Sequence, residues 1–162
     1  MAGLEDLYRE IILDHYRSPR NRGELAVPPA HRVEGFNPLC GDEVVVYLEL
    51  DGGVVKDLRI SGQGCSISQS SASMMSASVK GKTVEEVRTL IRSFKSMMSI
   101  HEQSLGGDEA EETQTVDPQD LGELAALQGV VKFPVRIKCA TLSWNALTQG
   151  LDEIAAGVPS NS

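Results

Sequence analysis

The stretch Asn37-Pro38-Leu39-Cys40-Gly41-Asp42 contains one of only three cysteines in this chain of 162 residues. The other two are Cys65 and Cys139. If the chain is extended at Cys40 and Asp42, their side chains point the same way, and the intervening Gly41 permits a kink if an extended path does not fit. Either geometry places a thiolate and a carboxylate side by side as two potential metal ligands.

A β-hairpin is expected directly after this stretch. Residues 43–50 and 54–60 are rich in branched apolar side chains, and Asp51-Gly52-Gly53 joins the two runs. Such runs on either side of a glycine-rich turn are typical of two antiparallel strands. Because the hairpin leaves Asp42 and returns to Cys65, it places both residues at the same end of a sheet.

Helical patterns lie on both sides of the hairpin. We expect helices over residues 4–17, 66–80, 83–98 and 134–156, a short helix that runs from Asp117-Pro118 to residue 127, and a further strand over residues 31–36. Gly81 ends the second helix, and Thr83 with Glu86 forms a capping box for the third. The sequence therefore predicts an α+β fold in which helices cover a small antiparallel sheet of about three strands, mostly on one side.

The two later cysteines also lie at expected helix starts. Cys65 follows two glycines at the beginning of one helix, and Cys139 lies shortly after Pro134, between basic residues. Both positions favour a thiolate. Three thiolates and the Asp42 carboxylate suit a tetrahedral zinc ion, although on spacing alone three small buried hydrophobic cysteines are an equally good interpretation.

Composition excludes several function classes. The chain is 41% hydrophobic, carries a net charge of −8 and has no apolar run near 18 residues, which predicts one globular domain over residues 1–162 without a membrane span. No basic patch suggests a nucleic-acid partner. An odd cysteine count without a secretory signal favours the cytoplasm. Residues 106–119 are acidic and almost free of large apolar side chains, so we expect a mobile loop there.

Several single residues have a plainer interpretation than a role at a metal site. We expect His15 to be a satisfied histidine near a helix end, and Met74 and Met75 to fill the core. His31 has no partner that can be recognised in the sequence. The basic residues near the first helix, Arg17, Arg20 and Arg22, are expected to be solvated, with a docking role as the alternative.

Four stretches in this order resemble the SufU family of iron–sulfur cluster assembly proteins, which is related to the U-type scaffolds IscU and the N-terminal domain of NifU. They are Leu7-Tyr8-Arg9 with Asp14-His15-Tyr16-Arg17-Ser18-Pro19-Arg20-Asn21, then Asn37 to Asp42, then Gly62-Gln63-Gly64-Cys65-Ser66-Ile67-Ser68, and finally Phe133-Pro134-Val135-Arg136-Ile137-Lys138-Cys139. U-type scaffolds carry a histidine where this chain has Lys138, and residues 106–127 match the place of an insertion in SufU proteins. The resemblance implies the U-type fold and the SufU branch.

The resemblance also implies a function. In this family, a cysteine desulfurase of the SufS type makes a persulfide, and a zinc-dependent sulfurtransferase accepts the outer sulfur and passes it to the SufBCD scaffold. In this chain Cys40 matches the acceptor, and Cys40, Asp42, Cys65 and Cys139 match the metal ligands. Arg136 matches a family arginine and is expected to steady the released thiolate or to pair with Asp42, with a surface arginine at a helix start as the alternative. Because a zinc-bound thiolate is a poor nucleophile, a histidine of the desulfurase takes the place of Cys40 on the metal.

Three alternatives remain open from the sequence. The chain is a scaffold for a labile iron–sulfur cluster, with Asp42 or an outside donor as fourth ligand; or it is a stand-alone thiol enzyme or metallohydrolase; or its zinc is purely structural. The sequence leaves open the oligomeric state, the choice of zinc or iron, and whether the chain is itself an enzyme. Residues Leu39, Phe133 and Pro134 are the expected partner contact.

Overall fold

The structure is a computed structural model that describes residues 4–27, 30–38, 41–106, 124, 126–127 and 134–157, with the backbone alone for 4–8, 99–106 and 134–135. Its elements are α1 (Leu4–Arg17), β1 (His31–Asn37), β2 (Asp42–Asp51), β3 (Val54–Gln63), α2 (Ser66–Val79), α3 (Val84–Gly106) and α5 (Pro134–Ala155). The expected α+β class is confirmed, and each of these elements begins within two residues of its expected position.

The three strands form one antiparallel sheet in the order β1-β2-β3. In the register, Asn37 at the end of β1 lies opposite Asp42 at the start of β2, and Glu43 lies opposite Gln63 at the end of β3. Gly52 and Gly53 both have positive φ angles in the β2–β3 turn, a conformation that glycine adopts without strain. The sheet therefore has a turn at one end and, at the other, the segments that lead to the cysteines.

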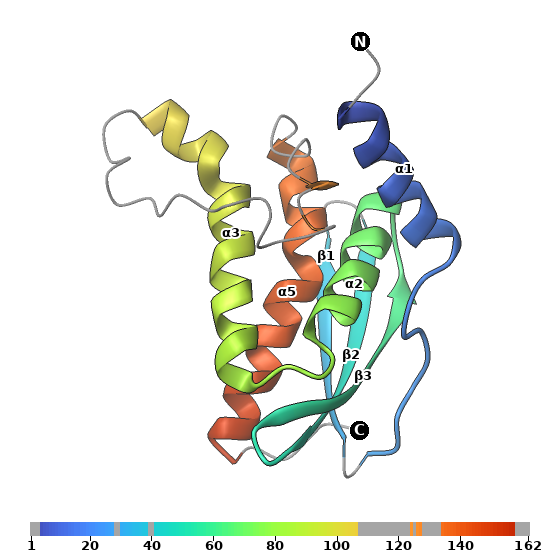
Figure 1. Cartoon of the computed structure of the whole chain (residues 1–162), viewed down its shortest axis with the longest axis vertical. Coiled ribbons are helices and arrows are strands. Elements are labelled where there is room, and N and C mark those ends of the chain that lie inside the picture. The colour runs from blue at the N-terminus through green and yellow to red at the C-terminus, as the bar shows by residue number, and fades with distance from the viewer. Residues whose placement is uncertain are drawn as a thin grey trace.

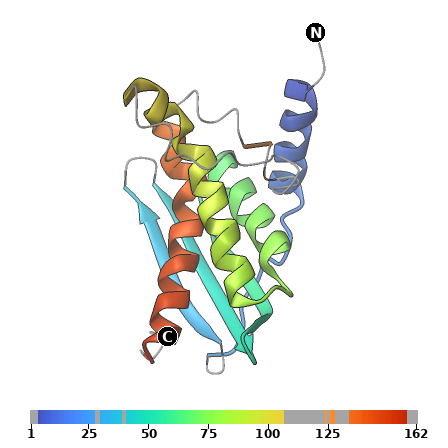
Figure 2. The same ribbon diagram turned by 60° about the vertical axis from the view of Figure 1, so that its left-hand side comes forward.

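The helices lie on one face of the sheet (Figures 1 and 2). Helix α5 packs on β1 and β2, α2 packs on β3, α3 lies against α5, and α1 packs against α2. The core between helices and sheet includes Val46, Leu58, Met74, Met75, Phe94, Trp144 and Leu147, all 1% exposed or less. Phe94 of α3 stacks on Trp144 of α5 with ring centroids 4.3 Å apart. Met74 and Met75 are core residues, as expected.

The capping box at the start of α3 is present. The Thr83 hydroxyl accepts a hydrogen bond from the Glu86 backbone N–H at 3.1 Å, and the Glu86 carboxylate accepts one from the Thr83 N–H at 3.0 Å. The expected end of this helix near residue 98 is wrong, because α3 continues to Gly106. Residues 99–105 contain neither proline nor glycine, so nothing in their sequence terminates the helix before Gly106.

The acidic insertion falls mostly outside the described residues. The expected mobile loop after residue 106, and the helix start at Asp117-Pro118, both lie there. At the far end of the insertion, Leu124, Ala126 and Leu127 are described and are 2% exposed or less. These three residues belong to the core region.

One glycine near the open end of the sheet is required by close packing. Gly62 has a φ of +120°, and a Cβ atom there would lie 2.3 Å from the Glu43 carbonyl oxygen. We expect Gly62→Ala to lower the free energy of unfolding by about 2 kcal/mol, because the backbone must both adopt a strained φ and move away. Urea denaturation measures this loss. Gly52→Ala is the control, because Gly52 also has positive φ but no atom within 4 Å of a Cβ; equal losses for the two variants would contradict the packing argument.

Candidate metal centre

The first turns of α2 and α5 lie at the end of the molecule where β2 begins, opposite the β2–β3 turn (Figure 1). The arrangement follows from the hairpin, which leaves this end at Asp42 and returns to it at Gln63. Only Gly64 and Cys65 separate β3 from α2, and Cys65 lies beside Asp42 at the start of β2. Helix α5 crosses β1 and β2, and its second turn contains Cys139.

Asp42 is fully buried and bonds directly to the start of α2. Its Oδ1 atom accepts a hydrogen bond from the backbone N–H of Cys65 at 2.9 Å, and its Oδ2 atom lies 4.0 Å from the Cys65 sulfur. Cys65 is the N-cap residue of α2 and has an extended backbone. A carboxylate at a helix N-terminus is electrostatically favourable, because the free N–H groups carry partial positive charge. Asp42 is therefore held in place beside a cysteine.

Together with Asp42 and Cys65, Cys139 completes a three-residue group. One ligand atom from each of the three residues lies within 4.8 Å of the other two. Ligand atoms around tetrahedral zinc are about 3.5 to 3.8 Å apart, given bond lengths of about 2.0 to 2.3 Å. The group therefore needs to contract by only about 1 Å to hold such an ion. Two sulfurs and one carboxylate oxygen form a donor set that zinc accepts.

The surroundings of this group are closely packed. A Cβ atom at Gly64 would lie 2.5 Å from Asp42 Oδ1 and 2.5 Å from the Ser68 hydroxyl. Only glycine fits at this position without moving the Asp42 carboxylate. Close packing around Asp42 therefore explains why Gly64 precedes Cys65, which the family motif alone does not reveal.

Cys40 lies outside the described residues, as do its neighbour Leu39 and Phe133, and the side chain of Pro134 is not described. The residues that flank the loop are described. Gly41 has a φ of +71°, so the kinked path is correct there and the extended one is wrong. The Gly41 N–H donates to the Asn37 carbonyl at 2.8 Å, which joins the two ends of the segment that contains Cys40.

Basic residues near this end are partly engaged within the chain. Arg22 donates to the Gln69 side chain at 2.8 Å and to the Gly62 carbonyl at 2.7 Å. Arg20 forms an ion pair with Asp14 at 2.6 Å. Arg22 is exposed and Arg20 is partly exposed, as expected of solvated residues, and both also bond to neighbouring parts of the chain. Arg136 is exposed on the first turn of α5, and its role stays a prediction.

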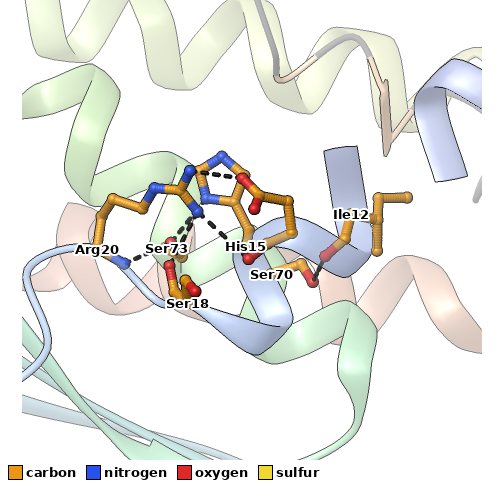
Figure 3. A network of polar contacts seen from close by, with 7 residues as sticks. Ile12, His15, Ser18, Arg20, Ser70 and Ser73 are labelled. Atoms are coloured by element: carbon orange, nitrogen blue, oxygen red, sulfur yellow. Dashed lines mark hydrogen bonds and ion pairs between the residues drawn. The ribbon is translucent and has the colours of Figure 1, made fainter. Parts of the chain in front are cut away.

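His15 is part of a polar network between α1 and α2 (Figure 3). The ring is 1% exposed, and its Nδ1 atom lies 2.7 Å from the Ser73 hydroxyl. The Arg20 backbone N–H donates to the same hydroxyl at 2.9 Å. These contacts confirm His15 as a satisfied histidine, and it is not among the residues that converge on the candidate metal group.

His31 has a partner that the sequence does not reveal. Its Nε2 atom lies 2.7 Å from the Glu153 carboxylate, which joins the start of β1 to the last turns of α5. Gln149 also donates to this carboxylate at 2.9 Å. The hydrogen bond from His31, followed by that from Gln149, holds the pKa of Glu153 below its ordinary value of 4.5.

This pair predicts a dependence of stability on pH. A carboxyl whose pKa is lowered by folding stabilises the fold above its unfolded-state pKa, and the contribution is lost as pH falls through the folded-state value. We expect metal-free Glu153→Gln to melt below the metal-free parent chain at pH 7. The difference should narrow as pH falls below the ordinary carboxyl value of 4.5, because the stabilisation is lost as the folded-state carboxyl is protonated. Glu10→Gln, at an exposed position on α1, is the control; a gap that stays the same from pH 7 down to the acid unfolding of the parent chain would contradict the assignment.

The sequence analysis missed the buried serines of α2, one of which bonds to α5 next to Cys139. Ser71 is fully buried, and its hydroxyl donates to the Ala140 carbonyl at 2.6 Å and accepts from the Trp144 indole N–H at 3.1 Å. Ser71 thereby ties the helix that begins after Cys65 to the helix that contains Cys139. The available signal was a helix of 14 residues in which several serines occupy core-facing positions, because buried hydroxyls require partners.

The fold and this site define a family. A family model described as the NifU-like N-terminal domain matches residues 7–140, and the chain belongs to this family. It is 45% identical to the zinc-dependent sulfurtransferase SufU of Bacillus subtilis, over 96% of this chain and 97% of that protein. It is also 36% identical to the iron–sulfur cluster assembly scaffold protein IscU of Streptococcus pyogenes, over 96% of this chain and 89% of that one.

Solved structures agree with this assignment. A candidate iron–sulfur cluster assembly scaffold protein of the SUF system from Fervidobacterium islandicum superimposes with a TM-score of 0.75 at 31% identity, covering 92% of this chain and 99% of that one. The N-terminal part of a NifU-like protein from Brucella abortus shares the fold, with a TM-score of 0.76 at 24% identity, covering 94% and 96% of the two chains. Within the described residues, no helix is both long enough and apolar enough to cross a membrane.

Proposed function

We propose that this chain is a zinc-dependent sulfurtransferase of iron–sulfur cluster assembly. The observation that carries the proposal is the convergence of Asp42, Cys65 and Cys139 within 4.8 Å at the end of the fold where the Cys40 loop begins and ends. In the proposal these three residues hold the ion, with Cys40 as the fourth ligand. The ion, when bound, keeps its thiolate ligands deprotonated.

The proposed reaction is a transfer of one sulfur atom. The Cys40 thiolate attacks the outer sulfur of a persulfide on a cysteine desulfurase. A sulfur–sulfur bond forms at Cys40 while the one on the desulfurase breaks, and the desulfurase cysteine leaves as a thiolate. We further propose that the sulfur passes from Cys40 to a SufBCD scaffold, and that the whole chain acts as one domain in the cytoplasm.

Arg136 is proposed to assist this reaction. It lies on the exposed side of the first turn of α5, one helical turn before Cys139. A guanidinium at this position attracts anions, so it steadies the Cys40 thiolate when that thiolate is released, or it pairs with Asp42. The inserted residues 106–127 are proposed to be a family insertion.

A scaffold that builds a labile iron–sulfur cluster is the second candidate. The similarity to proteins named as scaffolds favours it, since one of them covers 96% of this chain. Clusters normally take four thiolates, whereas this chain has three cysteines in all, so Asp42 or an outside donor would have to be the fourth ligand. Lys138, at the position where U-type scaffolds carry a histidine, argues for the sulfurtransferase.

The test begins with the metal content of the purified protein, followed by transfer of labelled sulfur from a cysteine desulfurase with and without a chelator. We expect one zinc per chain, and label on Cys40 that is lost on chelation. Cys40→Ser should abolish acceptance while the chain stays folded. Iron and sulfide on a brown protein would instead favour the scaffold. Wild-type transfer by Cys40→Ser would refute the acceptor assignment, and unfolding without a selective transfer defect would indicate a structural zinc.

A further inference from the structure

Asn37 makes three separate connections at the candidate metal centre. It is the register partner of Asp42 in the β1–β2 ladder. Its backbone carbonyl accepts the Gly41 N–H at 2.8 Å and so joins the ends of the segment that contains Cys40. Its side-chain Nδ2 atom lies 3.9 Å from the Cys139 sulfur and donates toward it. Asn37 thus pairs with Asp42, lies next to the Cys139 sulfur and closes the segment that contains Cys40. These are three of the four proposed ligands.

The side-chain contact is sheltered from water. Asn37 is 6% exposed, and Cys139 is fully buried. An amide N–H directed at a buried thiolate is a charge-assisted hydrogen bond, and water does not compete strongly for it. The backbone of Asn37 is held in the ladder opposite Asp42, which fixes the position of this residue beside the ligand group.

A hydrogen bond to a metal-bound thiolate changes the chemistry of the sulfur. It withdraws electron density, which makes the sulfur a weaker nucleophile and shifts the energy of its bond to the metal. Cys65, by contrast, is half-buried, and its sulfur faces the Asp42 carboxylate, an acceptor and not a donor once the thiol proton is lost. Cys65 and Cys139 therefore differ in their hydrogen-bond environment.

We propose that Asn37 is a positioning residue that makes Cys139 a permanent, unreactive ligand. Its amide donates to the Cys139 sulfur, keeps that thiolate on the metal and suppresses its attack on sulfur donors or alkylating agents. Sulfur acceptance is thereby confined to the loop whose ends the same residue joins. The inference rests on the metal site of the proposed function, but not on sulfur transfer, because its test measures metal binding and alkylation alone.

The test compares Asn37→Leu with the parent chain in its cobalt-loaded and zinc-loaded forms. Leucine fills a similar volume without a donor, Asn37→Ala is a smaller variant that cannot clash, and Asn145→Leu, exposed on α5, is the control. Without the hydrogen bond, we expect the sulfur-to-cobalt charge-transfer band to shift to longer wavelength. Zinc affinity should fall by about 10-fold, as for other outer-shell partners. Alkylation of Cys139 in the zinc form, followed by peptide mass spectrometry, should become about 5-fold faster.

The outcomes separate this inference from the proposed function. If the parent chain binds metal, and both Asn37 variants fold with an unshifted cobalt spectrum and unchanged Cys139 alkylation, the role of Asn37 is overturned while the sulfurtransferase stands. If the parent chain binds neither zinc nor cobalt, the proposed function fails and this inference is overturned with it, because Cys139 is then not a metal ligand. A shifted spectrum and faster Cys139 alkylation in Asn37→Ala alone also support the role, even if Asn37→Leu does not fold.

Discussion

Asp42→Ala is expected to lower zinc affinity by at least about 100-fold, because changes at outer-shell partners alone already cost about 10- to 100-fold. Asp42 is both a proposed ligand and the acceptor for the Cys65 N–H at 2.9 Å. The alanine variant therefore loses stability as well, since a buried N–H at the start of α2 no longer has its partner. Competition with a chromophoric chelator measures the affinity, and urea denaturation of the metal-free chain measures the stability.

Asp42→Asn separates these two roles. An asparagine oxygen can still accept the Cys65 N–H, but the neutral amide is a poor zinc ligand. We expect this variant to keep most of the metal-free stability and to lose most of the zinc affinity. If Asp42→Asn binds zinc as tightly as the parent chain, Asp42 is a structural residue of the α2 start and not a ligand.

Ser71→Ala is expected to cost about 3 kcal/mol of unfolding free energy, because it leaves the buried Trp144 N–H without this acceptor and removes the bond to the Ala140 carbonyl. The same change should lower zinc affinity by about 10-fold, an effect of outer-shell size. Ser71 bonds α2, which positions Cys65, to α5, which positions Cys139. Without these bonds the two helices are held less rigidly, and the distance between the two sulfurs varies more. Chemical denaturation and zinc competition give the two quantities separately.

Ser70→Ala is the matched control for this prediction. Ser70 is as buried as Ser71, but its hydroxyl donates to the Ile12 carbonyl of α1 at 2.7 Å (Figure 3). We expect it to reduce stability without a comparable loss of zinc affinity, because α1 supplies none of the proposed ligands. Equal losses of affinity in both variants would mean that zinc binding follows global stability and not the joint between α2 and α5.

Much of the fold could be predicted because local signals agreed with one another. The double glycine of the β2–β3 turn, the Thr83–Glu86 capping box and Gly81 each act over a few residues, and each is found where expected. The convergence of the two ends of the hairpin followed from the antiparallel topology. The placement of Cys65 at the start of α2 also followed, because helix N-termini can be recognised locally.

The rest depends on contacts between residues far apart in the chain. The pair between His31 and Glu153 spans 122 positions, and the bond from Ser71 to Ala140 spans 69. Such partners are set by how helices cross the sheet, and a single sequence carries no local record of that crossing. The N–H of Cys65 could bond to Asp42 only in the register that the strands adopt. The assignment of Cys40 and Arg136 to the reaction stays a prediction.

The origin of the site in widely separated segments has a consequence for folding. Asp42 and Cys65 are 23 positions apart, but the contact between Asn37 and Cys139 spans 102. Closing a long loop costs chain entropy and slows the search for the native contact. During synthesis, a complete donor set exists only after the last helix has emerged and packed. Tight capture of an ion therefore reports that β1, β2, α2 and α5 have packed together, and the time course of capture follows the slowest step of that process.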